Sequence, residues 1–296
     1  MKETMEYQNI RENKKYKDTL FRMVFKNKKD LLDLYNAVNH TNYEDETVLE
    51  VNTLENVLYI SMKNDASFII GNTMNLYEHQ STKNENMPLR GLLYFAKMYE
   101  NYIMEHDVDL FSSKIQKIPT PKYIVFYNGT EQEADKRILK LSDAFIKEGG
   151  CLECEVLLLN INYGRNRELM EKCRRLEEYS LFVATVRNYK QKDISLRKAI
   201  TLAIDECIEK GILLDILTKQ RNEVLEVVLS TFNQELYEKN LKQDAYEEGM
   251  EAGIEAGKLE EKKAFIHRNL KKGKTIEEIA ELLDEDKTKI QQLANG

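Results

Sequence analysis

Residues 65–80 have the sequence DASFIIGNTMNLYEHQ, with Gly71-Asn72 at the centre. This dipeptide is a signal for a two-residue hairpin loop between two strands. If Gly71 and Asn72 form the loop, the flanking strands pair outward from it one residue at a time. That register places Asp65 directly opposite Glu78, with the two Cβ atoms roughly 5 Å apart on one face of the sheet. The segment therefore predicts a β-hairpin that brings two carboxylates together.

The face that carries Glu78 is polar at one end and apolar at the other. Gln80 belongs to it, because Gln80 lies two residues beyond Glu78 and side chains alternate along a strand. The remaining positions of this face are Ser67, Ile69, Met74 and Leu76. His79 points to the opposite face, so we interpret it as a structural residue rather than a catalytic one.

Two adjacent carboxylates on mostly buried strands repel each other unless a cation or a proton lies between them. Mg²⁺ accepts one or two carboxylates and keeps its other positions for water and a phosphate oxygen. Such a metal lowers the pKa of a bound water and neutralises charge on the phosphate, which is suited to phosphodiester hydrolysis. The alternative is an exposed hairpin end at which both acids are simply solvated.

The elements around the hairpin predict an α/β fold. Hydrophobic spacing indicates helices at residues 15–39 and 87–105, and Pro88 suits the first turn of the second. A strand is expected within residues 48–60, further strands at 122–128 and 153–163, and a short helix at 137–148. From residue 168 onward only helices are expected, near 168–190, 194–210 and 213–244. The result is a mixed central sheet flanked by helices, with an all-helical C-terminal region.

The tail contains two patterns. In residues 248–257 the glycines are four apart and form one smooth side of a helix, which favours either close packing between two helices, for example of two copies, or a flexible linker. Thr275-Ile276-Glu277-Glu278 fits a capping box that opens an amphipathic helix, and a second short helix follows. This pattern is compatible with a helix-turn-helix, although a helical interaction tail is the interpretation that we favour.

Composition limits the function classes. The chain has 296 residues, 42% of them hydrophobic, and a net charge of −7. A protein that coats nucleic acid along its length is usually basic, so any DNA binding is expected at a local patch. Residues 1–17 are highly charged, and the longest apolar runs are far too short for a membrane span. We therefore expect a cytoplasmic protein with reduced thiols, in which the four cysteines are small buried residues rather than zinc ligands.

Asp65 followed by Glu78-His79-Gln80 resembles the motif of the PD-(D/E)XK nuclease superfamily. The run at residues 72–81, NTMNLYEHQS, together with NMPLR at 86–90, more closely resembles the Rpn family of recombination-promoting nucleases, also described as transposases. The opening at residues 17–26 is similar to the first helix of that family, and Tyr127-Asn128-Gly129 to the end of a later strand. The resemblance covers residues 15–165.

The resemblance implies a restriction-endonuclease-like core and a Mg²⁺-dependent DNA endonuclease, in which Mn²⁺ is expected to substitute. It implies that Asp65 and Glu78 bind the metal. Gln80 stands where the superfamily usually has lysine, and would orient the attacking water without bringing a positive charge. Asp18, on the first helix, is expected to approach the metal or orient the site, although a surface position is an equal alternative.

Three further residues are candidates around this site. Arg90 lies near the start of the helix after the hairpin, and an arginine at a helix N-terminus suits a phosphate contact with DNA. Lys83, in the preceding loop, is a second candidate DNA contact, for which plain solvent exposure is the favoured alternative. Glu50 is a weaker candidate for an upstream acidic ligand.

The predicted organisation has three parts: a nuclease-like domain at residues 1–165, a helical region at 166–245 and a helical tail at 246–296. Cutting two strands with one site per subunit favours a homodimer. The resemblance also implies a role in recombination, mobile elements or phage defence. The rival hypotheses are a non-catalytic binding or assembly protein that keeps the nuclease fold, and an RNA nuclease.

Overall fold

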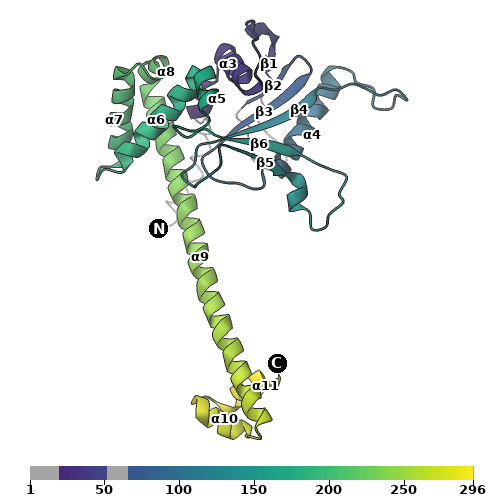
Figure 1. Cartoon of the computed structure of the whole chain (residues 1–296), viewed down its shortest axis with the longest axis vertical. Helices are drawn as coiled ribbons and strands as arrows, with labels where there is room; N and C mark the ends of the chain where they lie inside the picture. Colours follow the sequence, from purple (N-terminus) through teal and green to yellow (C-terminus); the bar gives the residue numbers. More distant parts are fainter. Residues whose placement is uncertain (1–19, 52–65, 296) are drawn as a thin grey trace, which may run out of the picture. The chain divides into compact units, whose positions relative to one another are not determined.

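The computed structural model describes residues 20–51 and 66–295 of the chain. It divides into two compact units, Met1–Glu235 and Leu236–Gly296. The first unit holds all of the described strands, which form a mixed sheet with helices on both faces (Figure 1). The second unit is helical.

Six strands make up the described sheet, in the order β1-β2-β3-β4-β6-β5. The central pairs β3–β4 and β4–β6 are parallel, whereas β1–β2, β2–β3 and β5–β6 are antiparallel. The strands are β1 (Leu49–Val51), β2 (Ala66–Ile70), β3 (Thr73–Gln80), β4 (Thr120–Tyr127), β5 (Lys136–Lys140) and β6 (Glu155–Asn160). The mixed sheet flanked by helices agrees with the predicted fold class.

The hairpin β2–β3 has the predicted register. Ile70 lies opposite Thr73 and Ala66 opposite Tyr77, with Gly71 and Asn72 as the loop. Gly71 has a φ of +56°, a conformation that glycine adopts without the strain of a Cβ. The predicted pair of Asp65 with Glu78 lies outside the described residues, because Asp65 does. The register is therefore confirmed as far as Tyr77 and its partner.

Helix α4 (Met87–Glu105) covers one face of the sheet, and its bounds are those that the sequence predicts. It packs its apolar side against residues of β2, β3, β4 and β6, including Met74, Leu76, Tyr123 and Val125. Gly91 allows the close approach, because a Cβ there would lie 2.5 Å from the ring of Tyr123. The helix is thereby fixed beside the strand that carries Glu78.

The other face is covered by helices from both ends of the described part of the first unit. They are α2 (Leu20–Val24), α3 (Lys28–Asn39), α5 (Arg167–Lys172), α6 (Arg174–Lys190), α7 (Leu196–Glu209), α8 (Leu214–Lys219) and the first part of α9 (Arg221–Lys271). Phe21, Phe126 and Phe182 belong to one continuous core, so the helical region shares its core with the sheet.

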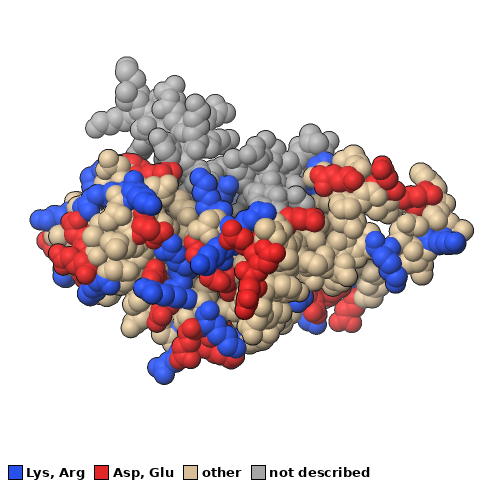
Figure 2. Space-filling view, turned by 90° about the horizontal axis from the view of Figure 1, so that it is seen from above, with Lys and Arg blue, Asp and Glu red and all other residues tan. Residues whose placement is uncertain are grey.

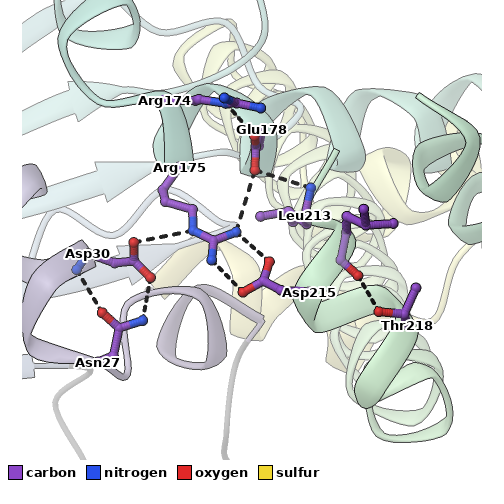
Figure 3. Close-up of polar contacts among 9 residues, drawn as sticks. Asn27, Asp30, Arg174, Arg175, Glu178, Leu213, Asp215 and Thr218 are labelled. Carbon is purple, nitrogen blue, oxygen red and sulfur yellow. Dashed lines mark hydrogen bonds and ion pairs between the residues drawn. The ribbon is translucent and has the colours of Figure 1, made fainter. Parts of the chain in front are cut away.

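Arg175 links these helices by polar contacts (Figure 3). Its guanidinium donates to Asp30 of α3 at 3.3 Å and to Asp215 of α8 at 2.7 Å, and it lies 3.5 Å from Glu178 of its own helix. Glu178 in turn accepts a hydrogen bond of 3.1 Å from the backbone nitrogen of Leu213. One cation thus holds three helices of the first unit together.

Several predicted elements differ from the structure. The helix expected at residues 137–148 is wrong: Lys136–Lys140 is the edge strand β5, followed by the short 3₁₀ helix η3 (Leu141–Ala144). Hydrogen bonding to β6 determines the structure there, and Leu139 is buried on the inner side. The expected helix at 15–39 is interrupted between α2 and α3, where Asn27 caps α3 by accepting from Asp30 N. Of the strand expected within 48–60, β1 is described, preceded by η2 (Glu46–Val48).

In the second unit, the end of α9 packs with α10 (Ile276–Leu283) and α11 (Lys287–Asn295) around Ile266, Ile279 and Ile290. The capping box is confirmed: the Thr275 hydroxyl accepts from Glu278 N, and the Glu278 carboxylate accepts from Thr275 N at 2.8 Å. None of the described helices combines the length and apolar character that crossing a membrane requires.

Candidate functional site

Glu78 is a carboxylate set into an apolar face of the sheet. Met74 and Leu76 precede it on the same face of β3, and both are buried in the core beneath α4. Glu78 itself is only 2% exposed. An ionised carboxylate at such a depth is stable only with strong compensating partners. The structure supplies a cation from α4 and a hydroxyl group from β4.

Arg90, in the first turns of α4, is the cationic partner of Glu78. Its Nη2 lies 3.2 Å from Oε2 and 3.4 Å from Oε1 of the carboxylate. Burial lowers the pKa of Arg90, but Glu78 and Tyr94 raise it, and the net shift is upward. The guanidinium is therefore charged. The sequence predicts that Arg90 contacts a DNA phosphate, and in the structure its charge faces Glu78.

Two tyrosine hydroxyls complete the cluster. Tyr123 of β4 donates a hydrogen bond of 3.1 Å to Oε2 of Glu78, and the Tyr94 hydroxyl accepts one of 3.3 Å from Nη2 of Arg90. Burial and the nearby Glu78 raise the pKa of both tyrosines, so both hydroxyls keep their protons. Sequence reasoning missed both tyrosines. Tyr94 carries one usable signal, since it lies four residues after Arg90 on the same helix face.

The last two residues of β3 are His79 and Gln80. Gln80 is half-buried at the end of the strand, where its backbone carbonyl accepts from Asn128 N at 2.9 Å. His79 lies on the opposite face, stacked on Phe21, with Nε2 2.8 Å from the Tyr179 hydroxyl. Burial, and after it Arg187, lower the pKa of His79 to about 3, so its ring is neutral. The predicted position of His79, away from Glu78, is confirmed.

Lys83 is not simply solvated, which corrects the favoured interpretation. Its ammonium group lies 3.4 Å from Glu133, a buried carboxylate that Arg137 also contacts at 3.3 Å. Arg137 makes a further ion pair of 2.8 Å with Glu85. Lys83 thus belongs to a small network of ion pairs, in the loop that leads from β3 to α4.

Glu50 is not brought to Glu78. It lies opposite Ile69, which pairs with Met74, near the turn of the hairpin. Glu78 is four residues further along β3, about 13 Å at the rise of a strand. Glu50 instead lines a cavity of about 380 Å³, together with His106 and Lys117. Glu50, the acidic candidate upstream of the hairpin, therefore lies near the hairpin loop and away from Glu78.

Asp65 and Asp18 lie outside the described residues, so their predicted places near Glu78 stay predictions. Within the described part of the chain, His, Cys, Asp and Glu side chains form no group of three or more that could hold a metal. Glu78 fits one requirement of Mg²⁺, which commonly binds through one or two carboxylates. The buried carboxylate is a hard oxygen donor, and among the described residues it makes its ion pair with Arg90.

The cysteines differ partly from expectation. All four are free thiols; Cys173 and Cys207 are buried as expected, whereas Cys151 is exposed and Cys154 is half-buried beside Gly91.

Acidic and basic side chains are interspersed over the face of the molecule shown in Figure 2. Neither sign of charge dominates the face in this view.

Comparison of the chain with protein-family models, with curated proteins and with solved structures finds no match in any of the three.

Proposed function

We propose that this protein is a Mg²⁺-dependent DNA endonuclease with a restriction-endonuclease-like core. One observation carries the proposal: Glu78 is a buried carboxylate at the end of a β-hairpin whose register, as far as Tyr77, is the one expected for a paired metal site. The hairpin is followed by α4 and the parallel strand β4, and this order supports the proposed core.

In this proposal, Glu78 and Asp65 hold the metal, with Asp65 taken from the sequence because it lies outside the described residues. The bound ion would supply a Lewis acid and a water of lowered pKa. Gln80, on the same face as Glu78, orients the attacking water through its amide. Arg90, at the start of α4, binds the phosphate that is cut. Tyr123 holds the Glu78 carboxylate in position.

We also propose DNA rather than RNA as substrate, a homodimer as the active form, and a cytoplasmic role in recombination, mobile elements or phage defence. The substrate and the biological role rest on the resemblance of residues 15–165 to the Rpn family. The homodimer rests on the need to cut two strands with one site per subunit, and the location on the composition of the chain. Asp18 keeps its proposed place as a further acidic group of the site. A non-catalytic binding protein of the same fold is the second candidate, favoured by the ion pair that Glu78 already makes with Arg90.

The test is cleavage of supercoiled plasmid in Mg²⁺ or Mn²⁺ by the full chain and by Glu78→Gln and Asp65→Asn. Each variant is expected to lose at least about a hundredfold in rate, as when one charge-stabilising group of a catalytic site is removed. Glu85→Gln is the matched control, since it neutralises an exposed carboxylate in the loop after the same strand.

Circular dichroism verifies that the variants are folded. If folded Glu78→Gln and Asp65→Asn cut as fast as the parent, the assigned site is wrong. If the parent binds DNA but never cuts it in either metal, the non-catalytic candidate replaces the nuclease. A structured RNA in parallel reactions separates the two substrate classes.

A further inference from the structure

The contact between Arg90 and Glu78 is not the strong form of an arginine–carboxylate pair. Strong pairs use two nitrogens in parallel, at about 2.7–2.9 Å. Here one nitrogen, Nη2, spans both oxygens of Glu78 at 3.2 and 3.4 Å. The pair is thus long and end-on rather than bidentate.

The rest of the Arg90 guanidinium is poorly satisfied. Among the described residues, its buried Nε has no hydrogen-bond partner, and Nη1 contacts the sulfur of Met87 at 3.5 Å, which is a weak acceptor. A buried donor without a partner is unfavourable by about 1–3 kcal/mol. Two of its three nitrogens therefore have no good acceptor within the described part of the chain.

The Arg90 side chain also reaches the surface of the protein. It is 22% exposed, so it is continuous with the surface rather than sealed in the core. It projects from the first turns of α4, where backbone N–H groups and the helix dipole favour anions. A phosphate oxygen is the type of acceptor that matches a planar guanidinium with free donors.

We propose that Arg90 is a displaceable counter-ion: it neutralises Glu78 in the metal-free protein, a divalent metal ion replaces it, and the released guanidinium binds a phosphodiester of DNA. Metal binding and DNA binding are then coupled through one side chain. Glu78 also keeps a counter-charge while no metal is bound. This inference rests on the proposed function, because it requires Glu78 to be a metal ligand.

Calorimetric titration of the full chain with MnCl₂ tests the first half. If Arg90 competes with the metal, Mn²⁺ should bind Arg90→Met more tightly than the parent. We expect the Kd for Mn²⁺ to fall by at least about tenfold. Arg90→Lys keeps a cation and should stay within about threefold of the parent. Arg197→Met is the matched control, since Arg197 pairs with Glu226 among the helices.

Glu78→Gln separates the two possible failures. If it abolishes Mn²⁺ binding while Arg90→Met binds like the parent, Glu78 is a ligand and the counter-ion proposal is overturned. If Arg90→Lys binds as tightly as Arg90→Met, loosening of α4 explains the gain, and the proposal is again wrong. If neither the parent nor Arg90→Met binds Mn²⁺ through Glu78, the metal site and the proposed function fall as well.

Binding of a short DNA duplex, measured by fluorescence anisotropy, tests the second half. Ca²⁺ is used as the cation because it coordinates the same hard oxygen donors. The parent should bind the duplex more tightly in Ca²⁺ than in EDTA, and Arg90→Met should lose most of that gain. An equal gain in both proteins would show that the released guanidinium is not a DNA contact.

Discussion

The hydroxyl group of Tyr123 donates a hydrogen bond of 3.1 Å to Oε2 of Glu78, and it does so from the strand next to the one that carries the carboxylate. Both side chains are buried. The bond joins β3 to β4 at the point where α4 brings in Arg90. It therefore fixes the orientation of the carboxylate independently of the ion pair.

Tyr123→Phe should lower the free energy of unfolding by about 1.5–3 kcal/mol, the usual range for a hydrogen bond to a charged group. The ring stays in the core, so the change isolates the hydroxyl. Tyr99→Phe is the control, because its hydroxyl donates to a neutral acceptor, the Pro119 carbonyl, at 2.6 Å. Urea unfolding should show the larger loss in Tyr123→Phe. An equal loss in both would mean that Glu78 is not held as a charged acceptor.

Gly91→Ala should destabilise the first unit by about 1–3 kcal/mol, the usual effect of overpacking. A Cβ at this position would lie 2.5 Å from the Tyr123 ring and 3.2 Å from the sulfur of Cys154, so α4 must move away from the sheet. The same movement would withdraw Arg90 from Glu78. Urea unfolding measures the loss, and a variant as stable as the parent would show that α4 does not pack this closely on β4.

The hairpin and α4 could be predicted because local signals determine them. Gly71-Asn72 specifies the loop and its register, and Pro88 with the apolar spacing specifies the helix. The edge strand β5 could not, because its short sequence KRILK has no strong period and pairing with β6 decides its conformation. The cluster at Glu78 was predicted only in part. Arg90 and Tyr123 are 12 and 45 residues away from Glu78 in sequence, and only the packing of α4 and β4 reveals that they meet it.

Stability should fall in acid partly through Asp215. The hydrogen bond from Arg175 lowers the pKa of Asp215 below its usual 3.8, against the opposing effect of burial. Because the folded protein has the lower pKa, the stabilisation is complete above about pH 4 and is lost as the pH falls through the folded value. Asp215 is half-exposed, so the effect is modest.

The comparison of Asp215→Asn with the parent measures this contribution. Urea unfolding should give a less stable variant at neutral pH. The difference between the two proteins should shrink in strong acid, where Asp215 of the parent is protonated in the folded and in the unfolded state. Asp205→Asn, at the Arg221 ion pair between α7 and α9, is a control of similar chemistry. A difference that stays constant with pH would rule out the charge of Asp215 as the cause.

The glycines of α9 offer a test of its role. A Cβ at Gly249, Gly253 or Gly257 would meet no atom within 4 Å, and all three glycines lie inside the helix. In an exposed helix, each Gly→Ala change stabilises by about 1 kcal/mol. The triple variant should therefore melt at a higher temperature by circular dichroism if this side of the helix faces solvent. If two copies pack along the glycines, the added methyl groups would instead separate them, and sedimentation would show a weaker dimer. We expect the stabilised helix, because nothing in the described chain packs against these positions.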